Sequence, residues 1–119
     1  MKNIDKRIVE INRRIRDIKE GLVTIEDMRP GSLTKQYRNP KKKKGEYYQI
    51  SYTYKMKSKT EYVRKEFIDK LQSEIQSFKK FKQLISEWKE LSIEKSKLSI
   101  LLSLGKKLEN ENLDDGETR

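Results

Sequence analysis

Side chains that can bind a polyanion are concentrated in one stretch of the chain, residues 29–65. All six tyrosines lie in this stretch, together with twelve Lys or Arg residues and only two Glu residues. Its formal charge of +10 equals that of the whole chain, so residues 1–28 and 66–119 are nearly neutral. Lysine and arginine neutralise phosphates, while tyrosine donates hydrogen bonds and offers a ring on which a base can stack. The pattern predicts a nucleic-acid-binding module.

The candidate contact residues fall into a loop and a β-hairpin. Four adjacent lysines follow Asn39-Pro40 and repel one another, so we expect an exposed loop. Residues 47–55 alternate with the period of a half-buried strand, a turn follows at residues 55–59, and residues 60–63 return as the partner strand. The predicted nucleic-acid-binding residues are Lys35, Arg38, Lys41, Lys42, Lys43, Lys44, Tyr47, Gln49, Ser51, Thr53, Lys55, Lys57, Lys59 and Arg64. Thr60 of the partner strand is a further candidate for contact with phosphates or base edges.

The hairpin needs backing, because two strands alone are marginally stable in water. Residues 33–38 are either a short first strand or an extended lead-in. Tyr48, Tyr52 and Tyr54 share a strand face with Ile50, so we expect these tyrosines to form a small core against a helix.

Two helices are expected on either side of the basic module. In residues 3–21 isoleucine recurs at spacings of four and three, which is the seam of a coiled coil. This seam fits either packing on the chain's own long helix or pairing with a second copy. A second helical pattern runs from residue 65 to about Leu104. Gly105 is expected to end that helix, and residues 105–119 are too polar to bury a core and are expected to be disordered.

The sequence therefore predicts an α+β protein. A small basic antiparallel β-sheet of two or three strands lies between an N-terminal coiled-coil-type helix and a long C-terminal helix. The expected segments are a helix and connector (1–28), the tyrosine-rich β module (29–65), the long helix (66–104) and the tail (105–119). With 33% hydrophobic and 40% charged residues the chain is lean for a self-contained globule, so a homodimer formed through the helices is expected.

The chain lacks the residues that several classes of protein function require. The chain has no cysteine and no histidine, and no Gly-rich phosphate loop, so we expect no enzyme activity, no metal site and no cofactor. Glu46 and Glu61, the two acids of the basic module, are expected to balance local charge. No apolar run approaches the roughly 20 residues of a membrane span, and no secretory signal is apparent. A cytoplasmic protein without membrane contact is expected.

Duplex DNA, bound mainly through its phosphates, is the favoured ligand, because a β-ribbon fits the major groove. Two alternatives stay open. In one, the basic module binds an acidic protein partner. In the other, the tyrosines stack on single-stranded RNA. A metal-dependent nuclease is the least favoured alternative.

Several short motifs resemble a known family. They are Met28-Arg29-Pro30-Gly31-Ser32-Leu33, Gln36-Tyr37, Gly45-x-Tyr47-Tyr48-x-Ile50-Ser51-Tyr52 and Lys57-x-Lys59-Thr60-x-Tyr62-Val63. Over about residues 28–98 the chain resembles a family of small uncharacterised bacterial and archaeal proteins, a domain of unknown function, often encoded near mobile elements. Many such relatives carry cysteines between the second and third motifs, which suggests a metal knuckle. Here Arg38-Asn39-Pro40 and lysines stand instead, so the resemblance implies a loop that works by charge alone.

Overall fold

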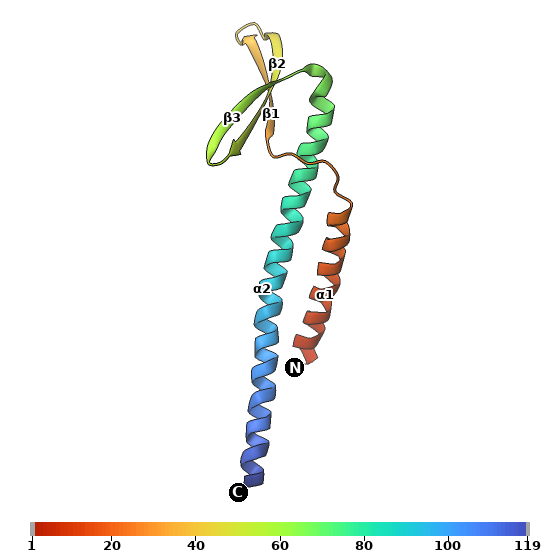
Figure 1. Cartoon of the computed structure of the whole chain (residues 1–119), viewed down its shortest axis with the longest axis vertical. Coiled ribbons are helices and arrows are strands. Elements are labelled where there is room, and N and C mark those ends of the chain that lie inside the picture. The colour runs from red at the N-terminus through yellow and green to blue at the C-terminus, as the bar shows by residue number, and fades with distance from the viewer. Residues whose placement is uncertain (1, 119) are drawn as a thin grey trace. The chain divides into compact units, whose positions relative to one another are not determined.

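The computed structural model describes the backbone of residues 2–118 and the side chains of residues 3–108. The order of elements confirms the predicted α+β class (Figure 1). The chain divides into two compact units, one made of residues 1–22 with 84–119 and one made of residues 23–83. The elements are α1 (Lys2–Val23), β1 (Ser32–Asn39), β2 (Lys44–Tyr54), β3 (Lys57–Val63), the 3-10 turn η1 (Lys65–Phe67) and α2 (Ile68–Thr118).

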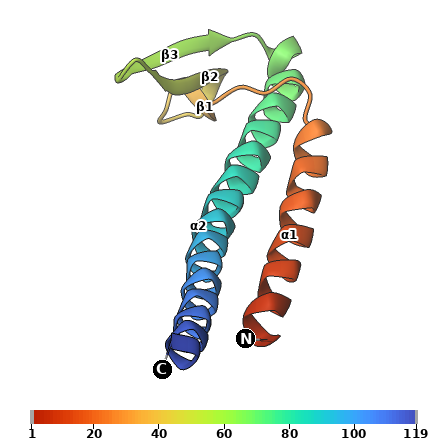
Figure 2. The ribbon, with the colours of Figure 1, turned by 60° about the horizontal axis from the view of Figure 1, so that its bottom comes forward.

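In the first unit, α1 runs antiparallel to the part of α2 that begins at Leu84 (Figure 2). Arg7 binds Glu94 and Arg14 binds Glu87, so a step of seven residues forward on α1 matches a step of seven backward on α2. Ile11 and Ile18 of the predicted seam are fully buried. The seam therefore packs on the chain's own long helix, as one of the two predicted alternatives requires.

In the second unit, the three strands form an antiparallel sheet in the order β1-β2-β3. Residues 33–38, which the sequence analysis left as either a strand or an extended lead-in, belong to strand β1. The register pairs Leu33 with Ile50 and Ile50 with Glu61, so β2 is the central strand. The predicted five-residue turn at 55–59 is wrong. The turn consists of Lys55 and Met56 alone, with φ of 51° and 65°, and Lys57 and Lys59 belong to β3.

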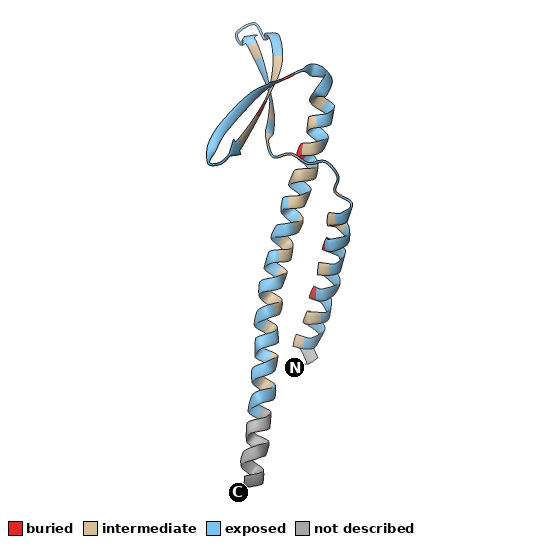
Figure 3. Ribbon diagram, in the orientation of Figure 1, coloured by how far each residue is buried: buried red, intermediate tan, exposed pale blue. Residues whose placement is uncertain are grey.

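The core of the sheet unit is small and lies where the sheet meets the start of α2 (Figure 3). Ile50, Val63 and Ile75 are buried there, and Tyr48 packs against them. The predicted tyrosine core is wrong for Tyr54, whose side chain is 54% exposed. At residues 52–54 β2 pairs with β3 alone, because β1 begins opposite Ser51. A two-stranded ribbon offers little surface against which a tyrosine ring can be buried.

The second helix is longer than predicted. It continues through Gly105 to Thr118, so the predicted helix end at Gly105 is wrong. One glycine costs about 1 kcal/mol in a helix and does not stop it when the residues on both sides favour helix. The predicted disordered tail falls mostly on residues 109–119, whose side chains lie outside the described residues.

Candidate nucleic-acid interface

The strand register divides the sheet into two faces of different chemistry. Directly opposed residues of antiparallel strands point to the same face, and successive residues alternate. One face carries Ile50 and packs on α2. The other side carries ten uncharged residues, which we call the open face, and Arg38 beyond them toward the β1–β2 turn. Its members are Ser32, Thr34 and Gln36 from β1, Tyr47, Gln49, Ser51 and Thr53 from β2, and Ser58, Thr60 and Tyr62 from β3.

Both carboxylates of the basic module lie on the opposite face, and cations hold them there. Glu46 forms an ion pair with Lys35, 2.7 Å between Nζ and Oε2, which lowers the pKa of Glu46 and raises that of Lys35. Glu61 accepts a hydrogen bond from the Tyr52 hydroxyl (2.7 Å) and one from Arg29 (2.8 Å). These two bonds, that of Tyr52 first, hold the pKa of Glu61 below its usual value. The open face is therefore free of negative charge.

The β1–β2 turn presents the lysine cluster. The Asn39 side chain accepts a hydrogen bond from the backbone N–H of Lys42 (3.3 Å), which fixes the turn. Gly45 follows with φ of 70°, and a Cβ there would stand 3.0 Å from the Cβ of Arg38. All four lysines, 41–44, are exposed, and among the side chains described none of them joins an ion pair. The turn therefore offers uncompensated positive charge.

The β2–β3 turn presents a second, smaller cationic group at the other end of β2. Lys55 lies in the turn with its ammonium 5.4 Å from the centre of the Tyr54 ring. Met56 beside it is 98% exposed. Lys57 and Lys59 sit opposite Tyr54 and Tyr52, which places both lysines on the Ile50 side of the sheet.

The structure brings together only part of the predicted set of contact residues. Tyr47, Gln49, Ser51 and Thr53 share the open face, and by strand alternation Arg38 extends it toward the lysine turn. Lys35, Lys57 and Lys59 belong to the other face, and Lys35 is paired internally. Arg64 follows β3 and makes a long contact of 3.5 Å with Glu66.

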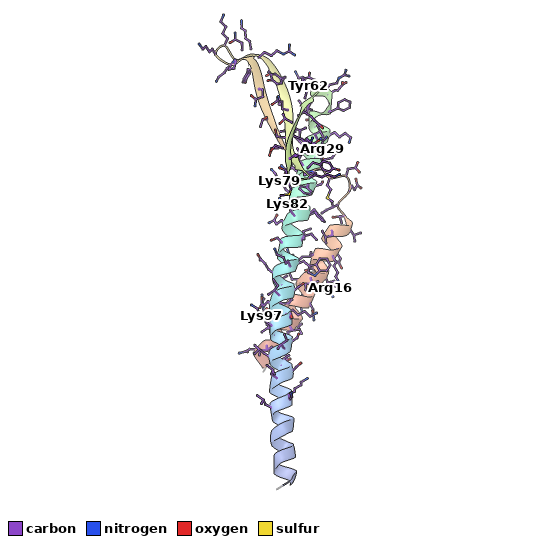
Figure 4. All side chains as sticks on the ribbon, turned by 60° about the vertical axis from the view of Figure 1, so that its left-hand side comes forward. Arg16, Arg29, Tyr62, Lys79, Lys82 and Lys97 are labelled. Carbon is purple, nitrogen blue, oxygen red and sulfur yellow. The ribbon has the colours of Figure 1, made fainter. Side chains whose placement is uncertain are left out.

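Five residues of the open face were not predicted from the sequence as contact residues. Side-chain contacts tie some of them to their neighbours. The Ser51 and Thr60 hydroxyls are 3.3 Å apart, and the rings of Tyr47 and Tyr62 are 6.5 Å apart (Tyr62 is labelled in Figure 4). The alternation of Ser, Thr and Gln in β1 was a usable signal, but only the register reveals which alternating sets share a face. The missed residues are Ser32, Thr34, Gln36, Ser58 and Tyr62.

Two findings concern other kinds of site. Within the described part of the chain, no three or more acidic side chains gather as metal ligands would. In the same part, no helix has the length and apolar content needed to cross a bilayer. The absence of a cofactor and of enzyme activity stays a prediction.

Comparison with protein families matches residues 5–73 to a family described as "Domain of unknown function (DUF6788)". The chain belongs to this family. The DUF6788 segment covers more than half of the chain and agrees with the predicted membership in an uncharacterised domain family. It begins within α1 and ends early in α2. The resemblance was expected over about residues 28–98, so the matched segment begins earlier and also ends earlier than expected. It contains the whole open face and both basic turns. No curated protein and no solved structure matched the chain.

Proposed function

We propose that this protein binds duplex DNA, mainly through phosphate contacts made by the two basic turns of its sheet. The observation that carries the proposal is the separation of charge. The lysines of both turns lack carboxylate partners among the described residues, while Glu46 and Glu61 are engaged on the Ile50 side. A surface with positive charge and no nearby carboxylate attracts a polyanion and releases its counterions.

The distance between the two turns suits a duplex. The eleven residues of β2 separate them. At about 3.3 Å per residue the strand spans about 33 Å, close to one helical turn of DNA at about 34 Å. One module therefore contacts phosphates at two places along the same duplex, and the association with mobile elements that the resemblance implies fits such a ligand. We propose binding without catalysis, in the cytoplasm and at the nucleoid.

We further propose that the protein acts as a homodimer formed through α2. Ile93, Ile100, Leu101 and Leu104 of α2 are each at least half exposed. They lie apart from the half-buried stripe of Leu84, Trp88, Leu91, Leu98 and Leu102 on the same helix. An open groove at Ile100 and Leu104 is lined by serines and by Lys107. Residues 92–104 carry one Glu and two Lys, so two copies repel each other little. A dimer would hold two sheet modules on one DNA.

Single-stranded RNA is the second candidate ligand, and one observation favours it. Tyr47 and Tyr62 lie side by side on the open face, and Tyr62 is 65% exposed. Exposed rings on a sheet stack with unpaired bases. Two rings among ten positions give a small stacking platform, whereas hydroxyl and amide groups fill the other eight, so duplex DNA is the better fit.

The test is a titration of the full chain with a labelled random duplex, a single-stranded RNA of the same length, and heparin, at increasing salt. If about five phosphates are contacted, the logarithmic slope with duplex DNA is about −4 to −5. Replacement of Lys41–Lys44 by Ala removes most of the affinity. Absence of duplex binding at low salt would falsify the proposal. Tighter binding of RNA would favour stacking, and binding of heparin alone would favour an acidic protein partner.

A further inference from the structure

We propose that the open face of the sheet contacts base edges in the major groove and makes the protein prefer particular duplex sequences. The inference rests on the proposed duplex-DNA binding and adds a sequence preference to it. The basic turns bind phosphates, which carry no sequence information, and the open face between them reads bases.

The chemistry of the open face matches base edges better than phosphates. Gln36 and Gln49 carry amides that can bond an adenine through its N6 and N7 atoms. The Ser and Thr hydroxyls of the face both donate and accept, so they suit any base. A solvent-facing sheet in a chain that is 40% charged would be expected to carry charges. Ten neighbouring positions carry no charge, and Arg38 stands beyond them toward the β1–β2 turn, so this surface suits a partner with polar groups flanked by phosphates.

The dimensions of the sheet suit the groove. In the central part, Ser32 and Thr34 of β1 flank Ser51 and Gln49 of β2, and β3 completes three strands. Neighbouring strands lie about 4.8 Å apart, so the axes of the two outer strands are about 10 Å apart, within the width of about 12 Å of the major groove. On either side of this centre the sheet narrows to a two-stranded ribbon, which the groove also admits.

The opposite face fixes the orientation of the open face. Ile50 and Val63 are buried against Ile75 of α2, so the alternating residues of the same strands must face outward. Hydrogen bonds restrict some of these outward side chains. Ser51 and Thr60 contact each other across β2 and β3, and the Gln36 amide donates to the Thr34 hydroxyl at 3.4 Å. Side chains held in this way lose less entropy when they bind.

The experiment is a selection from a random duplex pool with three forms of the full chain: wild type, Gln49→Ala and Gln83→Ala. Gln83 is an exposed glutamine of α2 that is not on the sheet and serves as the matched control. The wild type and Gln83→Ala should enrich the same sequence. Gln49→Ala should lose about 5- to 150-fold of the preference at one position, with an unchanged salt slope, because that slope counts phosphate contacts.

The outcomes that overturn the inference can be distinguished from one another. If the wild type binds duplex DNA but enriches no sequence, the proposed function stands and base reading is rejected. If it binds no duplex at any salt concentration, both are rejected. Circular dichroism checks that Gln49→Ala is folded. If Gln49→Ala is not folded, Thr34→Val and Thr53→Val replace it, because each removes one hydroxyl and keeps a β-branched side chain. Unchanged sequence selection by both variants would also reject the inference.

Discussion

Lys35 and Glu46, from neighbouring strands, form an ion pair with 2.7 Å between Nζ and Oε2 on the face of the sheet opposite the open face. The pair removes one cation and one carboxylate from the surface available to a ligand. Lys35 thus differs from the lysines of the β1–β2 turn in its surroundings but not in its formal charge. This difference makes it a control for a charge-based proposal.

Single replacements of lysine should separate local binding from net charge. Lys41→Ala and Lys42→Ala should each weaken duplex binding and reduce the magnitude of the salt slope by about 0.9 for each phosphate that is no longer neutralised. Lys35→Ala removes the same charge from the other face and should leave both quantities nearly unchanged. Fluorescence anisotropy across a salt series measures both. Equal effects of all three variants would show that only net charge matters.

Two glycine replacements should change stability in opposite directions. Gly31 has φ of 149°, and a Cβ there would stand 2.8 Å from Cγ1 of Ile50. Gly31→Ala should therefore lower the free energy of unfolding by about 1–3 kcal/mol. Gly21 lies inside α1, where a Cβ would be 3.4 Å from Cδ1 of Leu84. Gly21→Ala should raise it by roughly 0.5–1 kcal/mol. Urea denaturation compares the two, and a stable Gly31→Ala would argue against the close approach of Gly31 to Ile50.

The β2–β3 turn stores backbone strain that one replacement should relieve. Lys55 and Met56 both have positive φ, the geometry of a hairpin turn that favours glycine or asparagine. Met56→Gly should raise the free energy of unfolding by about 1 kcal/mol. Lys57→Gly, one residue later in β3, should lower it by roughly 0.5–1 kcal/mol. Thermal unfolding of both variants provides the measurement, and destabilisation by Met56→Gly would contradict this turn geometry.

The pairing of α1 with α2 should weaken in acid. Hydrogen bonds from Arg14 and Arg7 hold the pKa values of Glu87 and Glu94 below the ordinary 4.5. A lowered pKa in the folded state means that the stabilisation is complete above 4.5 and is lost as the pH falls through the folded-state values below it. Unfolding midpoints measured from neutral pH downward should show this loss. Glu87→Gln with Glu94→Gln should reduce the pH dependence in this range.

The dimer proposal predicts a change of mass when the exposed apolar residues of α2 become charged. Ile100→Glu with Leu104→Glu should convert a dimer to a monomer, because burying two carboxylates between helices is costly. Val9→Glu alters an apolar side chain of α1 that is 56% exposed and should leave the mass unchanged. Light scattering with and without duplex DNA distinguishes the forms. A wild-type monomer at all concentrations would reject the dimer.

Much of the secondary structure was readable from local patterns. The isoleucine spacing predicted α1, and the alternation around Ile50 predicted β2, because both signals repeat within a few residues. The end of α2 was not readable, since a single glycine such as Gly105 is a weak signal against favourable neighbours. The two-residue turn at Lys55-Met56 was missed because these residue types disfavour the positive φ values they adopt.

The candidate interface depends on information of a different kind. The sequence by itself determined the composition of the module, the concentration of its positive charge and the exposure of Lys41–Lys44, because charge and short-range repulsion are properties of neighbouring residues. Only the tertiary structure decided that Gln36, Gln49 and Tyr62 share one face without carboxylates while Glu46 and Lys35 pair on the other. Strand register joins residues far apart in the chain, and a shift of one position would have reversed both faces.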